Sequence, residues 1–155
     1  MLKKFVLGMM ILGFVGTASA ADVFTGTWKL NVAKSKYSPG PAPKAVTVVV
    51  AEKGADMAVS VSGTDAADKP IKSNYTFPMK GGPAAFAEGA PPSGATVVIK
   101  RPNANTLSST STLNGKEVGT SNTVMGADGK SFARTVKETN AEGKPVNNTL
   151  VYEKQ

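Results

Sequence analysis

The sequence predicts an all-β protein, built as a single up-and-down antiparallel barrel of about 8–10 strands, with a β-sandwich as the alternative. Three observations lead to this fold class. Apolar and polar residues alternate in short runs, no segment after residue 20 shows sustained helical periodicity, and Gly, Pro, Asn and Asp separate the runs. Because such strands have one apolar face and no helix to cover it, the sheet must close on itself or stack.

The alternation is clearest in the first run, where Phe24, Gly26, Trp28, Leu30 and Val32 share one face. Together with the later runs it predicts about nine strands of about 6–9 residues. The later runs span residues 45–52, 57–62, 71–77, 95–101, 106–113, 117–125, 131–139 and 147–153.

Turn chemistry predicts that neighbouring strands pair antiparallel. Asn114-Gly115 favours a type I′ hairpin turn, in which both central residues need positive φ, and Asp128-Gly129 is expected to repeat it. Residues 64–71 (Thr-Asp-Ala-Ala-Asp-Lys-Pro-Ile) and 139–146 (Thr-Asn-Ala-Glu-Gly-Lys-Pro-Val) are alike. A reused turn and a gene duplication explain that likeness equally well.

Residues 78–94 lie outside the strand pattern and hold four prolines and four glycines. Loops of this length are uncommon unless they serve as lids or binding loops or are disordered. The sequence leaves the choice between a lid and a disordered segment open.

The first twenty residues predict a secretory signal peptide. Lys3 and Lys4 precede an apolar run over residues 5–15, and Ala18-Ser19-Ala20 offers small residues for cleavage after Ala20. An uncleaved anchor is the alternative, but about 11 apolar residues fall short of the ~20 that span a bilayer. We therefore expect residues 21–155 to form one periplasmic or secreted domain without a stable membrane anchor.

Composition excludes several function classes. The 155 residues include no His and no Cys, which rules out a Ser-His-Asp triad, a thiol nucleophile and an ordinary zinc or copper site. The 11 acidic residues lie mainly at turns, so no paired-carboxylate site is expected. The 18 basic residues do not cluster as a nucleic-acid site requires. We expect a monomer that is no enzyme and has no metal, cofactor or nucleic-acid partner.

The two ends of the chain resemble known β-barrels. Phe24-Thr-Gly-Thr-Trp-Lys-Leu30 resembles the opening strand of the calycin superfamily, both the Gly-x-Trp of lipocalins and the first strand of fatty-acid-binding proteins. Val151-Tyr-Glu-Lys154 resembles the final strand of the latter. With residues 26–36, the Pro-Gly-Pro-Ala-Pro loop at 39–43 and residues 147–154 taken together, most of the chain resembles small exported bacterial lipocalin-like proteins of unassigned role. The resemblance implies a barrel with a cavity for a small apolar or amphiphilic ligand; the lipocalin version fits better, because Leu150 stands where fatty-acid carriers have Arg.

We assume that the face of each strand with most apolar residues points into the barrel, and this assumption predicts the residues that face the interior. The predicted ligand-binding residues are Trp28, Tyr75, Phe77, Ser109, Ser111, Thr120, Asn122, Phe132, Arg134 and Tyr152. Buried hydroxyl, amide and guanidinium groups must bond to each other, to water or to a ligand. Two interpretations remain open. These groups form an internal polar network, with Arg134 stacked on Trp28, or they form a pocket that binds the polar head of an amphiphile.

The leading hypothesis is an exported lipocalin-like protein that binds a small hydrophobic or amphiphilic molecule. One alternative is an interaction module, such as a periplasmic protease inhibitor, that presents residues 21–23 or 78–94 to an envelope protein partner. Another is a structural envelope protein with a solid barrel. An enclosed volume of several hundred Å³, typical of ligand pockets, would distinguish the first from the others.

Overall fold

The computed structural model describes residues 20–140 and 142–155. The predicted signal peptide lies outside these residues, apart from Ala20. The described chain forms β1 (Gly26–Leu30), the 3-10 helix η1 (Val32–Lys34), β2 (Ala45–Lys53), β3 (Asp56–Thr64), β4 (Pro70–Pro78), β5 (Gly81–Pro83), β6 (Ala85–Glu88), β7 (Ala95–Asn103), β8 (Thr106–Leu113), β9 (Lys116–Met125), β10 (Ser131–Thr139) and β11 (Pro145–Lys154). Within these ranges, no helix is long and apolar enough to cross a membrane.

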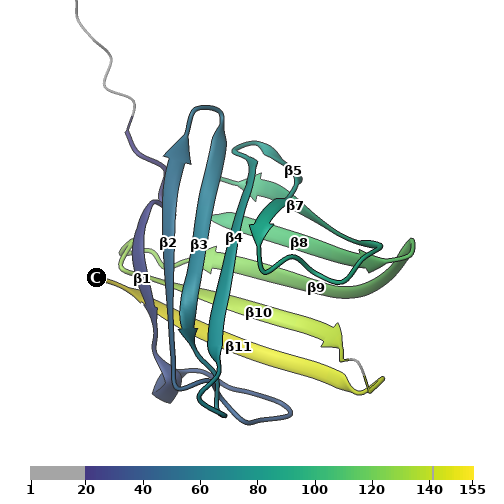
Figure 1. The fold of residues 1–155 in the computed structure, drawn as a ribbon. Helices are drawn as coiled ribbons and strands as arrows, with labels where there is room; N and C mark the ends of the chain where they lie inside the picture. Colours follow the sequence, from purple (N-terminus) through teal and green to yellow (C-terminus); the bar gives the residue numbers. More distant parts are fainter. Residues whose placement is uncertain (1–19, 141) are drawn as a thin grey trace, which may run out of the picture.

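All strands belong to one antiparallel sheet, in the order β5-β7-β8-β9-β10-β11-β1-β2-β3-β4-β6. Strands that follow one another in the chain are hydrogen-bonded neighbours from β7 to β11 and from β1 to β4, and β1 joins β11. Figure 1 shows β2–β4 crossing β8–β11 at a steep angle, so the sheet curls round an interior. The predicted up-and-down barrel is confirmed, and the nine predicted strands correspond to β1–β4 and β7–β11.

The barrel is nearly closed, because a short crossing segment covers the gap between β4 and β7. In this segment β5 pairs with β7, and β6 pairs with β4. Gly81 allows the close approach: its φ is +98°, and a Cβ there would lie 2.9 Å from the carbonyl oxygen of Ile99. Residues 78–94 are therefore not a structureless loop, and their two short strands raise the strand number to eleven.

Of the two predicted type I′ turns, one is confirmed and one is wrong. Asn114 and Gly115 both have positive φ, at 51° and 81°. In the second pair only Gly129 does, at 65°. The carboxylate of Asp128 instead accepts a hydrogen bond of 2.9 Å from the backbone N–H of Lys130.

The two similar segments fold into the same turn. The N–H of Asp65 donates to the carbonyl of Lys69, and the N–H of Asn140 donates to that of Lys144, each at 2.9 Å. The side-chain oxygen of Asp65 or Asn140 accepts the N–H of that lysine at 2.9 or 2.8 Å. In both turns the residue before the lysine has positive φ, at 63° and 77°. One local hydrogen-bond pattern is thus used twice.

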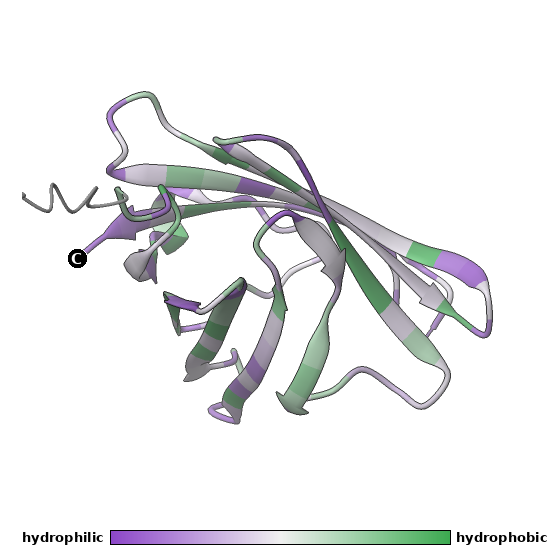
Figure 2. Ribbon diagram, turned by 90° about the horizontal axis from the view of Figure 1, so that it is seen from above, coloured by the Kyte–Doolittle hydropathy of each residue, from purple (hydrophilic) through white to green (hydrophobic). Residues whose placement is uncertain are grey.

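The core is centred on an aromatic stack at one end of the barrel. Trp28 is fully buried, donates through Nε1 to the carbonyl of Phe24 at 2.8 Å, and packs 4.9 Å from the ring of Phe132. Phe132 in turn stacks on Tyr152 at 4.8 Å. Figure 2 shows hydrophobic and hydrophilic segments alternating along the strands, as expected for a sheet with one face in the core.

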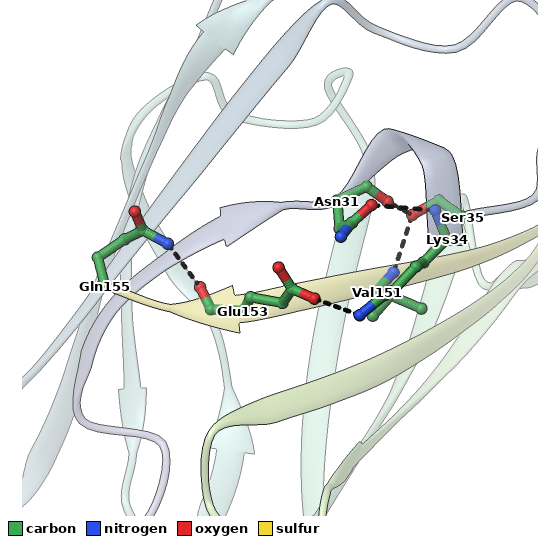
Figure 3. A network of polar contacts seen from close by, with 6 residues as sticks. All are labelled: Asn31, Lys34, Ser35, Val151, Glu153 and Gln155. Atoms are coloured by element: carbon green, nitrogen blue, oxygen red, sulfur yellow. Dashed lines mark hydrogen bonds and ion pairs between the residues drawn. The ribbon is translucent and has the colours of Figure 1, made fainter.

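A 3-10 helix interrupts the pairing between the first and last strands (Figure 3). After η1, the chain pairs with β11 again through Lys36 and Thr149. At the interruption, the hydroxyl of Ser35 donates to the carbonyl of Asn31 at 2.7 Å and accepts the N–H of Val151 at 3.0 Å. The hydroxyl thus replaces the ladder partner that Val151 lacks there.

Candidate functional site

A cavity of about 150 Å³ lies inside the barrel. It is lined by strand residues from both halves of the sheet and by Phe24, which precedes β1. The lining residues are Phe24, Val48, Val50, Met57, Val59, Val61, Tyr75, Phe77, Val97, Ile99, Leu107, Ser108, Ser109, Ser121, Thr123, Phe132, Arg134 and Tyr152. The barrel is not solid, although the cavity is smaller than the several hundred Å³ expected for a ligand pocket.

One wall of the cavity is apolar. β2 and β3 contribute valines, and β4 contributes Tyr75 and Phe77, whose ring centroids lie 6.4 Å apart. Phe132 and Tyr152 continue the aromatic surface onto β10 and β11. Such a wall suits an apolar body and offers ring edges and faces for contact.

Polar side chains from three consecutive strands, β8–β10, also line the cavity, beside the apolar side chains of Leu107 and Phe132. Ser109 on β8 and Ser121 on β9 are cross-strand partners, and their hydroxyl oxygens lie 2.8 Å apart. Thr123 on β9 and Arg134 on β10 are also cross-strand partners. Of the polar residues predicted on these three strands, Ser109 and Arg134 line the cavity, and on β9 Ser121 and Thr123 take the place of the predicted Thr120 and Asn122.

The guanidinium of Arg134 is the principal charge of the cavity. Its Nε is buried and has no hydrogen-bond partner among the described residues. The ion pairs formed by that part of the chain do not include Arg134. The hydroxyls of Thr25 and Tyr37 are also buried without a partner, but neither residue lines the cavity. Arg134 is half-buried, and a buried N–H without an acceptor is costly, so its Nε is the polar group of the cavity that most needs a further partner.

Tyr152 adds a neutral hydroxyl to this site. Burial raises the pKa of Tyr152 to about 12, although the positive charge of Arg134 acts in the opposite direction. Its side chain is only 7% exposed. The phenol therefore stays protonated at physiological pH and can donate a hydrogen bond.

The structure brings six of the ten predicted residues to the cavity: Tyr75, Phe77, Ser109, Phe132, Arg134 and Tyr152. Trp28 is buried behind Phe132 and does not line it. Ser111 is half-buried opposite Val97, on the same face of β8 as Ser109 but beyond the cavity lining.

The predicted inward orientation of Thr120 and Asn122 is wrong, because both side chains are exposed. A β-bulge is the reason. Ser111 pairs with Gly119 while the next residue of β8 pairs with Glu117, so Val118 is an extra residue on β9. Beyond the extra residue, side chains that would have pointed into the barrel point outward, and the reverse. The sequence analysis consequently missed Ser121 and Thr123, which line the cavity. Met125 could have revealed them, because it is buried and lies on the same face of β9 as these two residues.

The alternative in which Arg134 stacks on Trp28 is not observed. The ammonium of Lys154 lies 5.2 Å from the Trp28 ring instead. At the same end of the barrel, Arg101 lies 5.7 Å from the Phe24 ring and pairs with Asp22 at 2.5 Å. The side chain of Arg134 lines the cavity instead.

Protein-family models give no match to this chain, and neither do curated protein sequences. Among solved structures, the chain is similar to the zebrafish ileal bile acid-binding protein complexed with cholic acid. The TM-score is 0.42 with 9% sequence identity, over 86% of this chain and 99% of that one.

Proposed function

We propose that this chain is a periplasmic or secreted binding protein whose barrel cavity holds one small apolar or amphiphilic molecule. The observation that carries the proposal is the cavity of about 150 Å³, in which an aromatic wall faces the buried and unpartnered Nε of Arg134. Concave apolar sites with a few placed polar groups are typical of small-molecule binding.

The half-buried guanidinium of Arg134, with its buried and unpartnered Nε, favours binding over a purely structural role. A barrel that serves only as a scaffold gains nothing from a guanidinium beside an empty volume, because an apolar side chain of similar size would be neutral or stabilising there. A ligand in the cavity would supply the hydrogen-bond acceptor that the Nε of Arg134 lacks.

Export is proposed from the sequence features of residues 1–20. Mass spectrometry of the protein isolated from its own cells tests this part. We expect a mature chain that begins at Ala21 in the envelope or medium, and an intact Met1 in the cytosol would contradict export.

Native mass spectrometry of the protein purified from its own cell envelope tests ligand binding. We expect a co-purified small molecule that is released on unfolding. Trp28, the single tryptophan, provides a second readout because it lies 4.9 Å from Phe132 of the cavity wall. A clean apo mass, together with unchanged Trp28 fluorescence across a panel of small aromatics and lipids, would contradict the proposal.

A cavity-filling variant gives the control for that experiment. Val61→Phe introduces a ring at a half-buried position of the lining, where it would occupy part of the cavity volume. Val49→Phe makes the same change at a side chain of β2 that is 41% exposed. We expect the first variant to lose the bound molecule and the second to keep it.

A further inference from the structure

We infer that the ligand is a compact organic anion with a body of about one aromatic ring, bound with its acid group at Arg134. The inference rests on the proposed function and names the class of molecule that the cavity accepts. Three features of the cavity carry it: volume, charge and the arrangement of hydroxyl groups.

The volume sets the size of the body. An apolar protein cavity of about 150 Å³ holds a benzene molecule. The cavity here has about the same volume and is lined by five aromatic side chains, Phe24, Tyr75, Phe77, Phe132 and Tyr152. Pockets for larger ligands enclose roughly 300–1,000 Å³. A single ring therefore fits within this volume, whereas a long acyl chain or a steroid exceeds it.

The charge sets the sign of the polar group. No Asp or Glu is among the residues that line the cavity, so Arg134 has no acidic neighbour there. Its Nε is buried without a partner. A carboxylate or another oxyanion would supply both the missing charge and the missing acceptor, and guanidinium pairs with such groups through two parallel hydrogen bonds.

The hydroxyl groups set the orientation of the acid. The hydroxyls of Ser109 and Ser121 share one hydrogen bond, which uses one of their two protons. The remaining proton is available to a ligand oxygen. Because Thr123 pairs with Arg134 across the strands, and Ser121 lies two residues before it, these donors line one wall. The acid group is thus directed to β8–β10, and the ring to the aromatic residues.

Isothermal titration of the envelope-purified protein, after removal of bound small molecules, tests the inference with three probes. Benzoate has the expected size and charge, benzyl alcohol has the size without the charge, and cholate has the charge on a larger body. We expect benzoate to bind at least tenfold more tightly than either of the others.

Arg134→Met is the matched variant, and Arg134→Gln is the second variant should the first fail to fold. Either change should weaken benzoate at least tenfold and leave benzyl alcohol unchanged. Equal affinities for benzoate and benzyl alcohol, with no effect of the variants, would overturn the assigned charge. Tighter binding of cholate than of benzoate would overturn the assigned size. In both cases the proposed binding function would stand; it would fall only if no probe bound and the native protein carried no small molecule.

Discussion

The hydroxyl oxygens of Ser109 and Ser121 lie 2.8 Å apart on facing strands, at the polar wall of the cavity. This contact exists because Val118 is an extra residue on β9, which places Ser121 rather than Thr120 or Asn122 inside the barrel. The bulge therefore determines which hydroxyl groups a ligand can meet.

Removal of one hydroxyl from this pair should weaken the fold. Ser121→Ala leaves the Ser109 hydroxyl without its protein partner, and the net loss of such a hydrogen bond is about 0.5–1.5 kcal/mol. Asn122→Ala is the matched control, because its exposed side chain predicts a change within about 0.5 kcal/mol. Urea denaturation measures both. A larger loss for Asn122→Ala would mean that Asn122, and not Ser121, faces inward.

The ion pair between Asp22 and Arg101 should contribute strongly to stability. Their side chains are only 11% and 13% exposed. Asp22→Asn leaves the charge of Arg101 uncompensated, and breaking a buried pair in this way costs about 3–5 kcal/mol. Lys44→Ala breaks an exposed pair with Asp68 and should cost about 0–1 kcal/mol. Thermal unfolding would contradict the assignment if the two variants lost equal stability.

Tyr152 should make the protein less stable at high pH. The folded state holds the phenol proton up to a pKa of about 12, while the unfolded chain releases it near the ordinary value of 10.0. The unfolded state binds fewer protons between these values, so stability is complete below pH 10 and falls by about 3 kcal/mol as pH rises to about 12.

Tyr152→Phe isolates this effect, because it removes the titrating hydroxyl and keeps the ring on Phe132. Urea unfolding of this variant should show a shallower decline over the same pH range. Identical declines for the two proteins would indicate that Tyr152 ionises normally.

The sequence alone predicts most strands, because alternation and turn residues are local. Nine runs correspond to nine strands, and Asn114-Gly115 has the expected turn conformation. β5 and β6 were missed because strands of three and four residues are too short to show alternation. Their pairing with the edges of β7 and β4 is set by the closing of the barrel.

The candidate site was predicted less completely than the strands. The bulge at Val118 has no local sequence signature, and Val124, which is 43% exposed, indicated the wrong face. The volume of the cavity depends on how the rings of Phe24, Phe77 and Phe132 pack in three dimensions. Neither property can be derived from the period of a single strand.

Ser35 should stabilise the junction between the first and last strands. Ser35→Ala removes the partner of both the Val151 N–H and the Asn31 carbonyl, and unsatisfied backbone groups of this kind cost about 1–3 kcal/mol. Lys34→Ala next to it breaks only an exposed pair with Glu153 and should change little. Hydrogen exchange at Val151 gives the local readout: we expect faster exchange in Ser35→Ala alone, and equal exchange in both variants would contradict this role.

A crystal structure of the envelope-purified protein soaked with 4-bromobenzoate is the most direct test that the barrel holds a small ligand. We predict anomalous density for bromine among the aromatic side chains of the cavity, with the carboxylate within hydrogen-bonding distance of Arg134. A fully occupied barrel interior, with side chains filling the volume and no density for the probe at saturating concentration, would contradict the account.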